Sequence, residues 1–205
     1  MKKVFVTMLV VILAIATAIG LNKTVLKDKT PAFEVATLLK PAKNLGHFQL
    51  DSTQDKPFTD QSFSGHWTVM FFGYATCPKI CPQALALMSE VWRSYPGQKP
   101  NPNAQFVFVS LNPDKDSVDN LKTFLGQFHP DFIGLTGPKA EIVRLSTASG
   151  VFSWTAPAEE GSDVTIIDHS ASILVISPEG RLKALFSPPH DAIAIAKDLK
   201  ALMVG

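Results

Sequence analysis

The stretch FFGYATCPKICPQAL, residues 71–85, contains the only two cysteines of this 205-residue chain. It begins inside a continuous apolar run at residues 67–72, which is typical of a strand buried on both faces. After the cysteines, apolar residues recur at helical spacing and predict an amphipathic helix over residues 82–95. Cys77 and Cys81 therefore lie between a buried strand and a helix. In open α/β sheets, binding and active sites lie at the C-terminal ends of the strands, which is where this junction is expected.

The rest of the chain repeats this alternation of strands and helices. Ser117 is a helix-capping residue type placed before apolar positions of helical spacing, and Gly150 follows another helical segment. The expected strands are residues 105–111, 164–167, 172–177 and 181–186, and the expected helices are residues 118–128, 139–149 and 193–202. Strands that alternate with helices and close with a hairpin and a helix indicate an α/β sheet covered on both faces.

The N-terminus carries a hydrophobic segment. Lys2 and Lys3 precede 18 positions, residues 4–21, that are apolar apart from threonines and one glycine. This length lies between a secretory signal and a membrane span, and residues 16–18 form a small-residue triplet typical of cleavage sites. We favour an uncleaved single-pass anchor at residues 1–21 over a cleaved signal, because the apolar run continues past the triplet. Both alternatives place the rest of the chain on the periplasmic or extracytoplasmic side of the inner (cytoplasmic) membrane.

Residues 22–43 are interpreted as a tether, because they contain lysines and two prolines without a hydrophobic period. The remaining residues, 44–205, number 162, which is enough for one hydrophobic core. The formal charge is +5 for residues 1–43 and −4 for residues 44–205. An acidic domain argues against nucleic acid as a partner, whereas a basic tail suits an anionic membrane surface.

The spacing of the two cysteines indicates a reactive pair. A structural disulfide is disfavoured, because closing so short a loop adds little stability. If both residues lie in the first helical turn, a spacing of four places both sulfurs on one face, and the helix N-terminus favours thiolates. Two thiolates suit Cu(I), and one added imidazole gives a three-coordinate site for Cu(II), whereas structural zinc usually takes four protein ligands. Disulfide cycling stays open, although thioredoxin-type pairs are normally separated by two residues.

An imidazole ligand has to come from one of five histidines. His169 follows Asp168 just before the strand expected at residues 172–177, where a loop can approach the end of the first strand. Position alone leaves a second interpretation equally open, namely a loop histidine hydrogen-bonded to Asp168. The other four are interpreted as surface loop residues or, for His129, as a helix terminus; they are His47, His66, His129 and His190.

Three segments together resemble the Sco/SenC family of membrane-anchored copper proteins. FFGYATCPKICPQAL is similar to that family's phenylalanine-glycine-aromatic stretch followed by two Cys-Pro pairs. FVFVSLNPDKDS, residues 106–117, is similar to its second strand with a D-P-x-x-D-T segment. IIDHSASILVISPEGRL, residues 166–182, is similar to its D-H-[ST] segment with the following strand and turn. The resemblance runs from Gly46 to Leu202, nearly the whole domain.

The resemblance implies a thioredoxin-like sheet flanked by helices, with an inserted hairpin that we place around residues 151–165. It also implies that Cys77 and Cys81 supply thiolates, and His169 an imidazole, to one copper ion, as Cu(I) or Cu(II). Asp168 is expected to orient that imidazole.

The function implied by the resemblance is that of a metallochaperone, a binding protein more than an enzyme. Family members deliver copper to the binuclear copper site of cytochrome c oxidase during assembly, so the expected partners are that copper-site subunit and a copper donor or thiol reductant protein. The alternative is a membrane-anchored thiol–disulfide oxidoreductase acting on that site's cysteines or on a copper chaperone, in which Cys77 attacks and Cys81 resolves. A peroxidase on the same fold and a redox or copper sensor are further alternatives.

Three positions depart from the family pattern. Lys79 stands between the cysteines where an Asp is common, and its positive charge is expected to lower the thiol pKa. In the second segment Asn112 replaces an Asp and Ser117 replaces a Thr. These differences bear on partner recognition more than on copper binding.

Overall fold

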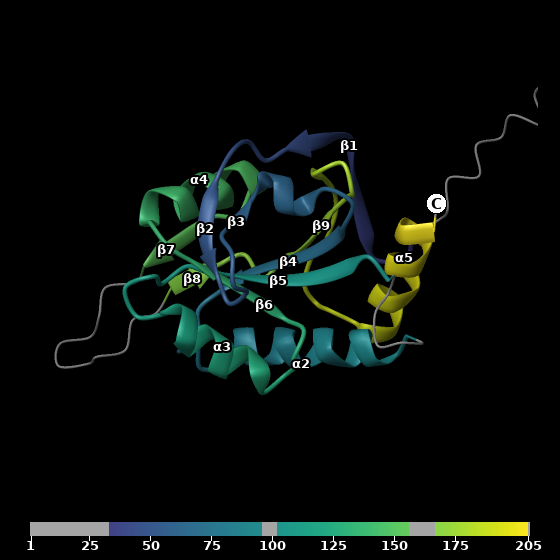
Figure 1. Cartoon of the computed structure of the whole chain (residues 1–205). Coiled ribbons are helices and arrows are strands. Elements are labelled where there is room, and N and C mark those ends of the chain that lie inside the picture. Colours follow the sequence, from purple (N-terminus) through teal and green to yellow (C-terminus); the bar gives the residue numbers. More distant parts are fainter. Residues whose placement is uncertain (1–32, 96–101, 156–166, 205) are drawn as a thin grey trace, which may run out of the picture. The chain divides into compact units, whose positions relative to one another are not determined.

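An eight-stranded mixed sheet with helices on both faces forms the folded part of the chain (Figure 1). The computed structural model describes residues 33–95, 102–155 and 167–204. The strand order is β1-β10-β9-β4-β5-β6-β2-β3, and β7 and β8 form a separate two-stranded sheet. The α/β sheet expected from the sequence is confirmed.

The strands of this part are β1 (Ala36–Asn44), β2 (Gln49–Ser52), β3 (Phe58–Thr59), β4 (Trp67–Gly73), β5 (Ala104–Ser110), β6 (Ile133–Thr136), β7 (Ser153–Thr155), β8 (Ile167–His169), β9 (Ile173–Ile176) and β10 (Arg181–Phe186). The helices are the 3₁₀ turn η1 (Asp60–Phe63), α2 (Ile80–Arg93), α3 (Val118–Gly126), α4 (Lys139–Ser149) and α5 (Ala192–Val204).

Strand β4 lies at the centre of the sheet and is buried at every position. It pairs in parallel with β5 and antiparallel with β9, and β5 in turn pairs in parallel with β6. Because side chains alternate across a sheet, Val69 and Phe71 of β4 enter one hydrophobic core, whereas Met70 and Phe72 enter the other. Both faces of this strand are therefore buried, which is what the uninterrupted apolar run in the sequence indicated.

The two cores are covered by different elements. The core that contains Val69 is packed by apolar residues of α2, α3 and α5, and Figure 1 shows α2 and α3 along one side of the sheet. The core that contains Met70 is closed by α4, which lies on the opposite side of the sheet, and by apolar residues of the β2–β3–η1 segment. Burial of one apolar stripe per helix is the largest stabilising contribution to such an arrangement.

Two helix boundaries follow the capping rules. Ser117 has extended backbone angles, and its side chain accepts a hydrogen bond from the Asn120 amide at 3.2 Å at the start of α3. Gly150 ends α4 with a φ of 74°, a left-handed conformation that glycine adopts without steric cost. The limits expected for α4 and β10 from the sequence match the observed ones.

The tether expected to reach Lys43 is wrong at its C-terminal end, because β1 already begins at Ala36. This strand pairs antiparallel with β10, with a register shift between Leu38 and Lys43. It lies at the edge of the sheet, where lysines and a proline such as Pro41 are tolerated because one side of the strand faces no partner. Edge residues of this kind do not show the apolar alternation by which a strand is recognised in sequence.

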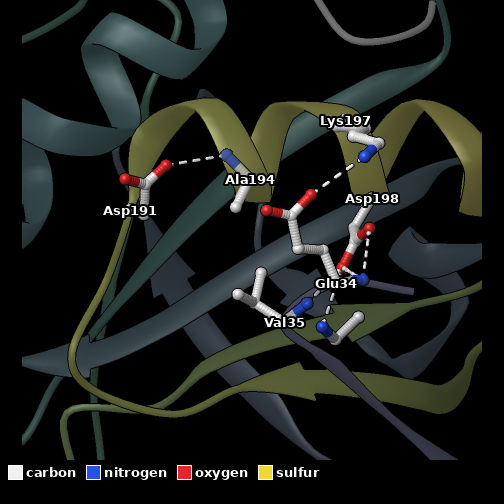
Figure 2. A network of polar contacts seen from close by, with 7 residues as sticks. Glu34, Val35, Asp191, Ala194, Lys197 and Asp198 are labelled. Carbon is white, nitrogen blue, oxygen red and sulfur yellow. Dashed lines mark hydrogen bonds and ion pairs between the residues drawn. The ribbon is translucent and has the colours of Figure 1, made fainter.

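A buried carboxylate fixes the start of this strand. Asp198 of α5 is 2% exposed and accepts the backbone amides of Glu34, Val35 and Ala36 at 2.8 to 3.0 Å (Figure 2). Next to it, Lys197 forms an exposed ion pair with the Glu34 side chain at 2.9 Å. The chain is therefore held against the C-terminal helix before it enters the sheet.

Several expectations fall outside the described residues. These are the membrane anchor at residues 1–21, the tether up to residue 32, and residues 156–166, which include most of the expected hairpin and of the strand at residues 164–167. The ends of that hairpin region are described, because β7 pairs antiparallel with β8. Within residues 33–95, 102–155 and 167–204, no helix has the length and apolar character needed to cross a membrane.

Candidate metal centre

The two cysteines lie where β4 passes into α2, as the sequence predicted, and both are free thiols. The condition that both cysteines lie in the first helical turn is met by Cys81 and not by Cys77. Lys79 has φ −144° and ψ −59°, which is not helical, so α2 begins at Ile80 and only Cys81 lies within it. The pair is nevertheless joined locally, because the Cys81 amide donates a hydrogen bond to Cys77 Sγ at 3.4 Å.

Gly73, the last residue of β4, leaves room for one of the sulfurs. A Cβ atom at this position would lie 2.7 Å from Cys81 Sγ and 2.9 Å from Cε2 of Phe108. Any larger residue would displace the sulfur or the ring. The glycine before the cysteine loop is therefore required by close packing at the candidate site.

The pKa values of the two thiols are shifted in opposite directions. Burial opposes ionisation of Cys77, but hydrogen bonds from Cys81, from the Lys79 backbone and from the Tyr74 hydroxyl outweigh it and lower the Cys77 pKa. Burial raises the pKa of Cys81 far above the ordinary thiol value, and the neighbouring Cys77 and Asp116 raise it further. Cys77 therefore ionises more readily than Cys81, and Cys81 is a thiol that ionises when it gains a cationic partner.

A buried carboxylate ties the cysteine loop to the neighbouring strand. Asp116 is 1% exposed, and its Oδ2 accepts the Ala75 amide at 3.0 Å and the Ser110 hydroxyl at 2.6 Å. The same hydroxyl oxygen accepts the Asn112 amide at 3.0 Å. The NPDKDS segment that follows β5 therefore packs behind the loop and restrains it.

Tyr74 connects the cysteine loop with strand β8. Its side chain is 2% exposed, and its hydroxyl oxygen accepts the backbone amide of Ile167 at 3.4 Å. The side chain of Tyr74 also shares a hydrogen bond with Cys77, which lowers the Cys77 pKa. One phenol thus contacts both a predicted copper ligand and the strand that ends at His169.

His169 is the last residue of β8 and lies opposite Ser153 of β7. The structure describes its backbone, so the predicted contact of its imidazole with the two sulfurs stays a prediction. Among side chains that the structure does describe, no group of three or more histidine, cysteine, aspartate or glutamate residues could hold a metal ion. The described part of the site is therefore the two-cysteine pair.

The other four histidines have local roles. His47 forms an exposed ion pair with Asp60 at 2.9 Å, and His66 is exposed. His129 is buried and stacks on Phe132, beyond the C-terminal end of α3, near the helix terminus expected for it. His190 is half-buried rather than a free surface residue, and its Nε2 lies 2.7 Å from the Ala171 carbonyl oxygen.

Sequence reasoning did not identify Tyr74, Asp116 or His190 as part of this region. Tyr74 and Ile167 are 93 positions apart, and Ala75 and Asp116 are 41 positions apart. No spacing rule links such residues, because the contacts arise only when β4, β5 and β8 meet. The available signal was that Tyr74 and Asp116 both lie inside the segments that carry the family resemblance.

The sequence profile described as SCO1/SenC matches residues 36–204. The chain belongs to the SCO1/SenC family. The mitochondrial SCO1 homologue of Mus musculus is 32% identical over 158 residues, which cover 77% of this chain and 55% of that protein. Among the first curated relatives, matches cover only 63 to 64% of the relatives' own lengths.

Solved structures agree with this membership. ScoI of Bradyrhizobium japonicum, whose structure has copper bound, is 33% identical with a TM-score of 0.68, over 76% of this chain and 97% of that one. The apo Sco1 protein of Thermus thermophilus gives a TM-score of 0.73 at 27% identity, over 84% of this chain and 99% of that one. The sheet of this SCO1/SenC protein is thus the thioredoxin-like one, as the resemblance implied.

Proposed function

We propose that this SCO1/SenC protein is a copper metallochaperone that delivers copper to the binuclear copper site of cytochrome c oxidase during assembly. The observation that carries the proposal is the joined pair of free thiols at the start of α2, in which the Cys81 amide contacts Cys77 Sγ at 3.4 Å. The copper-bound ScoI relative, 33% identical over most of the domain, supports the identity of the metal.

The chemistry of the donor set fits copper as cargo. Cys77 is already biased towards the thiolate by its hydrogen bonds, and a thiolate pair is the preferred environment of Cu(I). Cys81 releases its proton when the cation binds, because a metal inverts the pKa preference of a coordinating thiol. We assign the third ligand to His169, which completes the set for Cu(II), and we assign to Asp168 the role of orienting that imidazole.

The location of the protein and its partners belong to the same proposal. Residues 1–21 anchor the chain in the inner membrane, and the sheet domain lies on the extracytoplasmic side, where it receives copper from a donor protein. The client is the copper-site subunit of the oxidase. The formal charge of +5 on residues 1–43 supports contact with an anionic membrane surface.

The test is copper binding by the full chain, purified in detergent and reduced, with the reductant then removed. One equivalent of Cu(II) is added without oxygen, and absorption and EPR spectra are recorded beside His169→Ala, Cys77→Ser and Cys81→Ser. Strong sulfur-to-copper charge-transfer bands in the wild type that disappear in all three variants are the expected result. A wild type without such bands contradicts the proposed function.

A second candidate, a thiol–disulfide oxidoreductase, is favoured by the asymmetry of the two cysteines. Cys77 is 9% exposed with a lowered pKa, whereas Cys81 is fully buried. In that reaction the Cys77 thiolate attacks a client disulfide and releases one client thiolate. Cys81 then attacks the Cys77 sulfur of the mixed disulfide, which releases the second client thiol and leaves a Cys77–Cys81 disulfide.

The two candidates differ in their need for His169. Under the oxidoreductase alternative, His169→Ala reduces a client disulfide nearly as fast as the wild type. Cys77→Ser makes no first attack, and Cys81→Ser stops at the mixed disulfide. Prompt formation of a Cys77–Cys81 disulfide on addition of two equivalents of Cu(II), each reduced to Cu(I), without a charge-transfer band, favours this alternative over copper delivery.

A further inference from the structure

The segment that carries His169 is held from both of its ends by side chains of other elements. Two residues before His169, the Ile167 amide donates to the Tyr74 hydroxyl oxygen at 3.4 Å. Two residues after it, the Ala171 carbonyl oxygen lies 2.7 Å from Nε2 of His190. A carbonyl can only accept, so Nε2 of His190 carries the hydrogen and donates it.

The backbone of this segment also pairs with β7. His169 is paired with Ser153, and the Ser170 amide donates to the Phe152 carbonyl oxygen at 3.3 Å. Phe152 is 79% exposed, and β7 and β8 are three-residue strands outside the main sheet. A two-stranded pair of this size is marginally stable by itself. Burial of Ile167 in the core that contains Val69 and the polar contacts of Tyr74 and His190 connect it to the main sheet and its helices.

Tyr74 and His190 differ in burial and in the elements next to which they lie. Tyr74 immediately follows β4, is buried, and contacts Cys77 as well as β8. His190 lies just before α5 and is half-buried, and its other ring nitrogen, Nδ1, has no hydrogen-bond partner among the described residues. Each ring makes one contact to the backbone near His169, and the two contacts lie on opposite sides of that residue.

We propose that Tyr74 and His190 are positioning residues that hold the His169 backbone in place for Cu(II) capture by the Cys77–Cys81 pair. The inference rests on the proposed copper function and adds two residues that touch the predicted ligand's segment rather than the metal. Residues that orient a metal ligand commonly change metal affinity by about 10-fold to 100-fold when they are removed. Cu(I), which the two thiolates hold, depends on them much less.

The experiment compares Cu(II) and Cu(I) affinities of the full chain, each measured by competition with a chromogenic chelator without oxygen. Tyr74→Phe retains the buried ring and removes only the hydroxyl. We expect its Cu(II) affinity to fall by about 10-fold or more, with a changed copper hyperfine splitting in the EPR spectrum, while its Cu(I) affinity changes much less. Tyr95→Phe is the matched control, because that hydroxyl bonds to the Ala196 carbonyl between α2 and α5, away from the cysteines.

His190 provides a test that does not touch Cys77. His190→Ala removes the donor to Ala171 and is expected to give the same selective loss of Cu(II) affinity. His190→Gln places an amide N–H near the position of Nε2 and should restore most of it. His66→Ala, at an exposed histidine, is the control for loss of an imidazole.

The outcomes separate the inference from the function on which it rests. A wild type that binds no Cu(II) contradicts the proposed function itself. A wild type with the charge-transfer bands whose affinity and EPR spectrum are unchanged in Tyr74→Phe and His190→Ala overturns only the inference. Equal losses for Cu(I) and Cu(II) in Tyr74→Phe also overturn it, because the hydroxyl would then act through the Cys77 thiolate.

Discussion

Close packing at single residues decides whether the cysteine pair can form. At Gly73, an added Cβ would lie 2.7 Å from Cys81 Sγ, and the nearest aromatic carbon, Cε2 of Phe108, would be 2.9 Å away. We expect Gly73→Ala to lower the free energy of unfolding by about 1–3 kcal/mol, as other overpacked cores do. Displacement of the sulfur should also weaken copper binding. Urea denaturation and the Cu(II) charge-transfer bands measure the two effects.

Gly126 offers a matched control for this substitution. It is the last residue of α3, and an added Cβ there meets no atom within 4 Å. Gly126→Ala should leave copper binding unchanged and raise stability slightly, by roughly 0.5 kcal/mol, because alanine restricts the unfolded chain. If both variants had the same free energy of unfolding, the cysteine loop would accommodate the added methyl group without destabilising the fold.

The acidities of the two thiols predict a pH-dependent difference in reactivity. The Cys77 pKa is lowered and the Cys81 pKa is raised, so alkylation of the metal-free reduced protein by iodoacetamide should modify Cys77 first, with a rate midpoint below that of an ordinary thiol. Peptide mass spectrometry over a pH series measures both rates. In urea the two residues should react alike, and equal rates in the folded protein contradict the assignment.

The same shifts have opposite consequences for stability. A group whose folded-state pKa is lowered stabilises the fold at pH values above its unfolded pKa, and that contribution is lost as the pH falls through the folded value. Cys77 therefore stabilises the folded state at pH values above the pKa of an unfolded cysteine. Cys81, whose folded-state pKa is raised, contributes below its unfolded pKa and loses that contribution as the pH rises through the folded value.

Much of the residue-level site could be predicted from the sequence, but not its internal contacts. The apolar run before the cysteines and the helical spacing after them identify the β4–α2 junction without any structure. The contacts of Tyr74 with Ile167 and of Asp116 with Ala75 depend on how three strands are arranged. The side-chain placement of His169 stays a prediction from the family resemblance.

Among the elements, the contact between α5 and the start of β1 depends on one carboxylate. Asp198 is buried and accepts three backbone amides, from Glu34, Val35 and Ala36 (Figure 2). Hydrogen bonds to a buried charge are stronger than neutral ones, and an amide replaces one of the two acceptor oxygens by a donor. Asp198→Asn should therefore reduce the free energy of unfolding by about 2–3 kcal/mol.

Lys197→Ala is the control for this prediction, because it removes the neighbouring ion pair to the Glu34 side chain, which is exposed to solvent. Exposed pairs of this kind contribute little, so no measurable change in stability is expected. Urea denaturation followed by circular dichroism compares both variants with the wild type. If Lys197→Ala were the more damaging change, the carboxylate would not be the main attachment of β1.

Elements with a strong hydrophobic period were predicted well, and short or edge elements were not. The limits of α4 and β10 agree with those expected, and β4, β5 and β9 differ by one residue or so at their ends. Strand β6 is four residues long and contains Gly134, and β1 contains lysines and Pro41, so neither shows an apolar alternation. Their place in the sheet comes from pairing with β5 and β10, which is tertiary information.

For the molecule as a whole, the position at which the folded part begins has a direct experimental consequence. A chain that starts at Phe33 keeps β1 and the amides that Asp198 accepts, whereas one that starts at Asn44 loses both and leaves β10 as an edge. The shorter chain should lose about 3 kcal/mol or more of stability, because the buried carboxylate is then unpaired. It should also associate through the exposed edge of β10. Urea midpoints and sedimentation velocity compare the two chains, and equal midpoints with two monomeric species would mean that β1 is dispensable and that the fold begins after it.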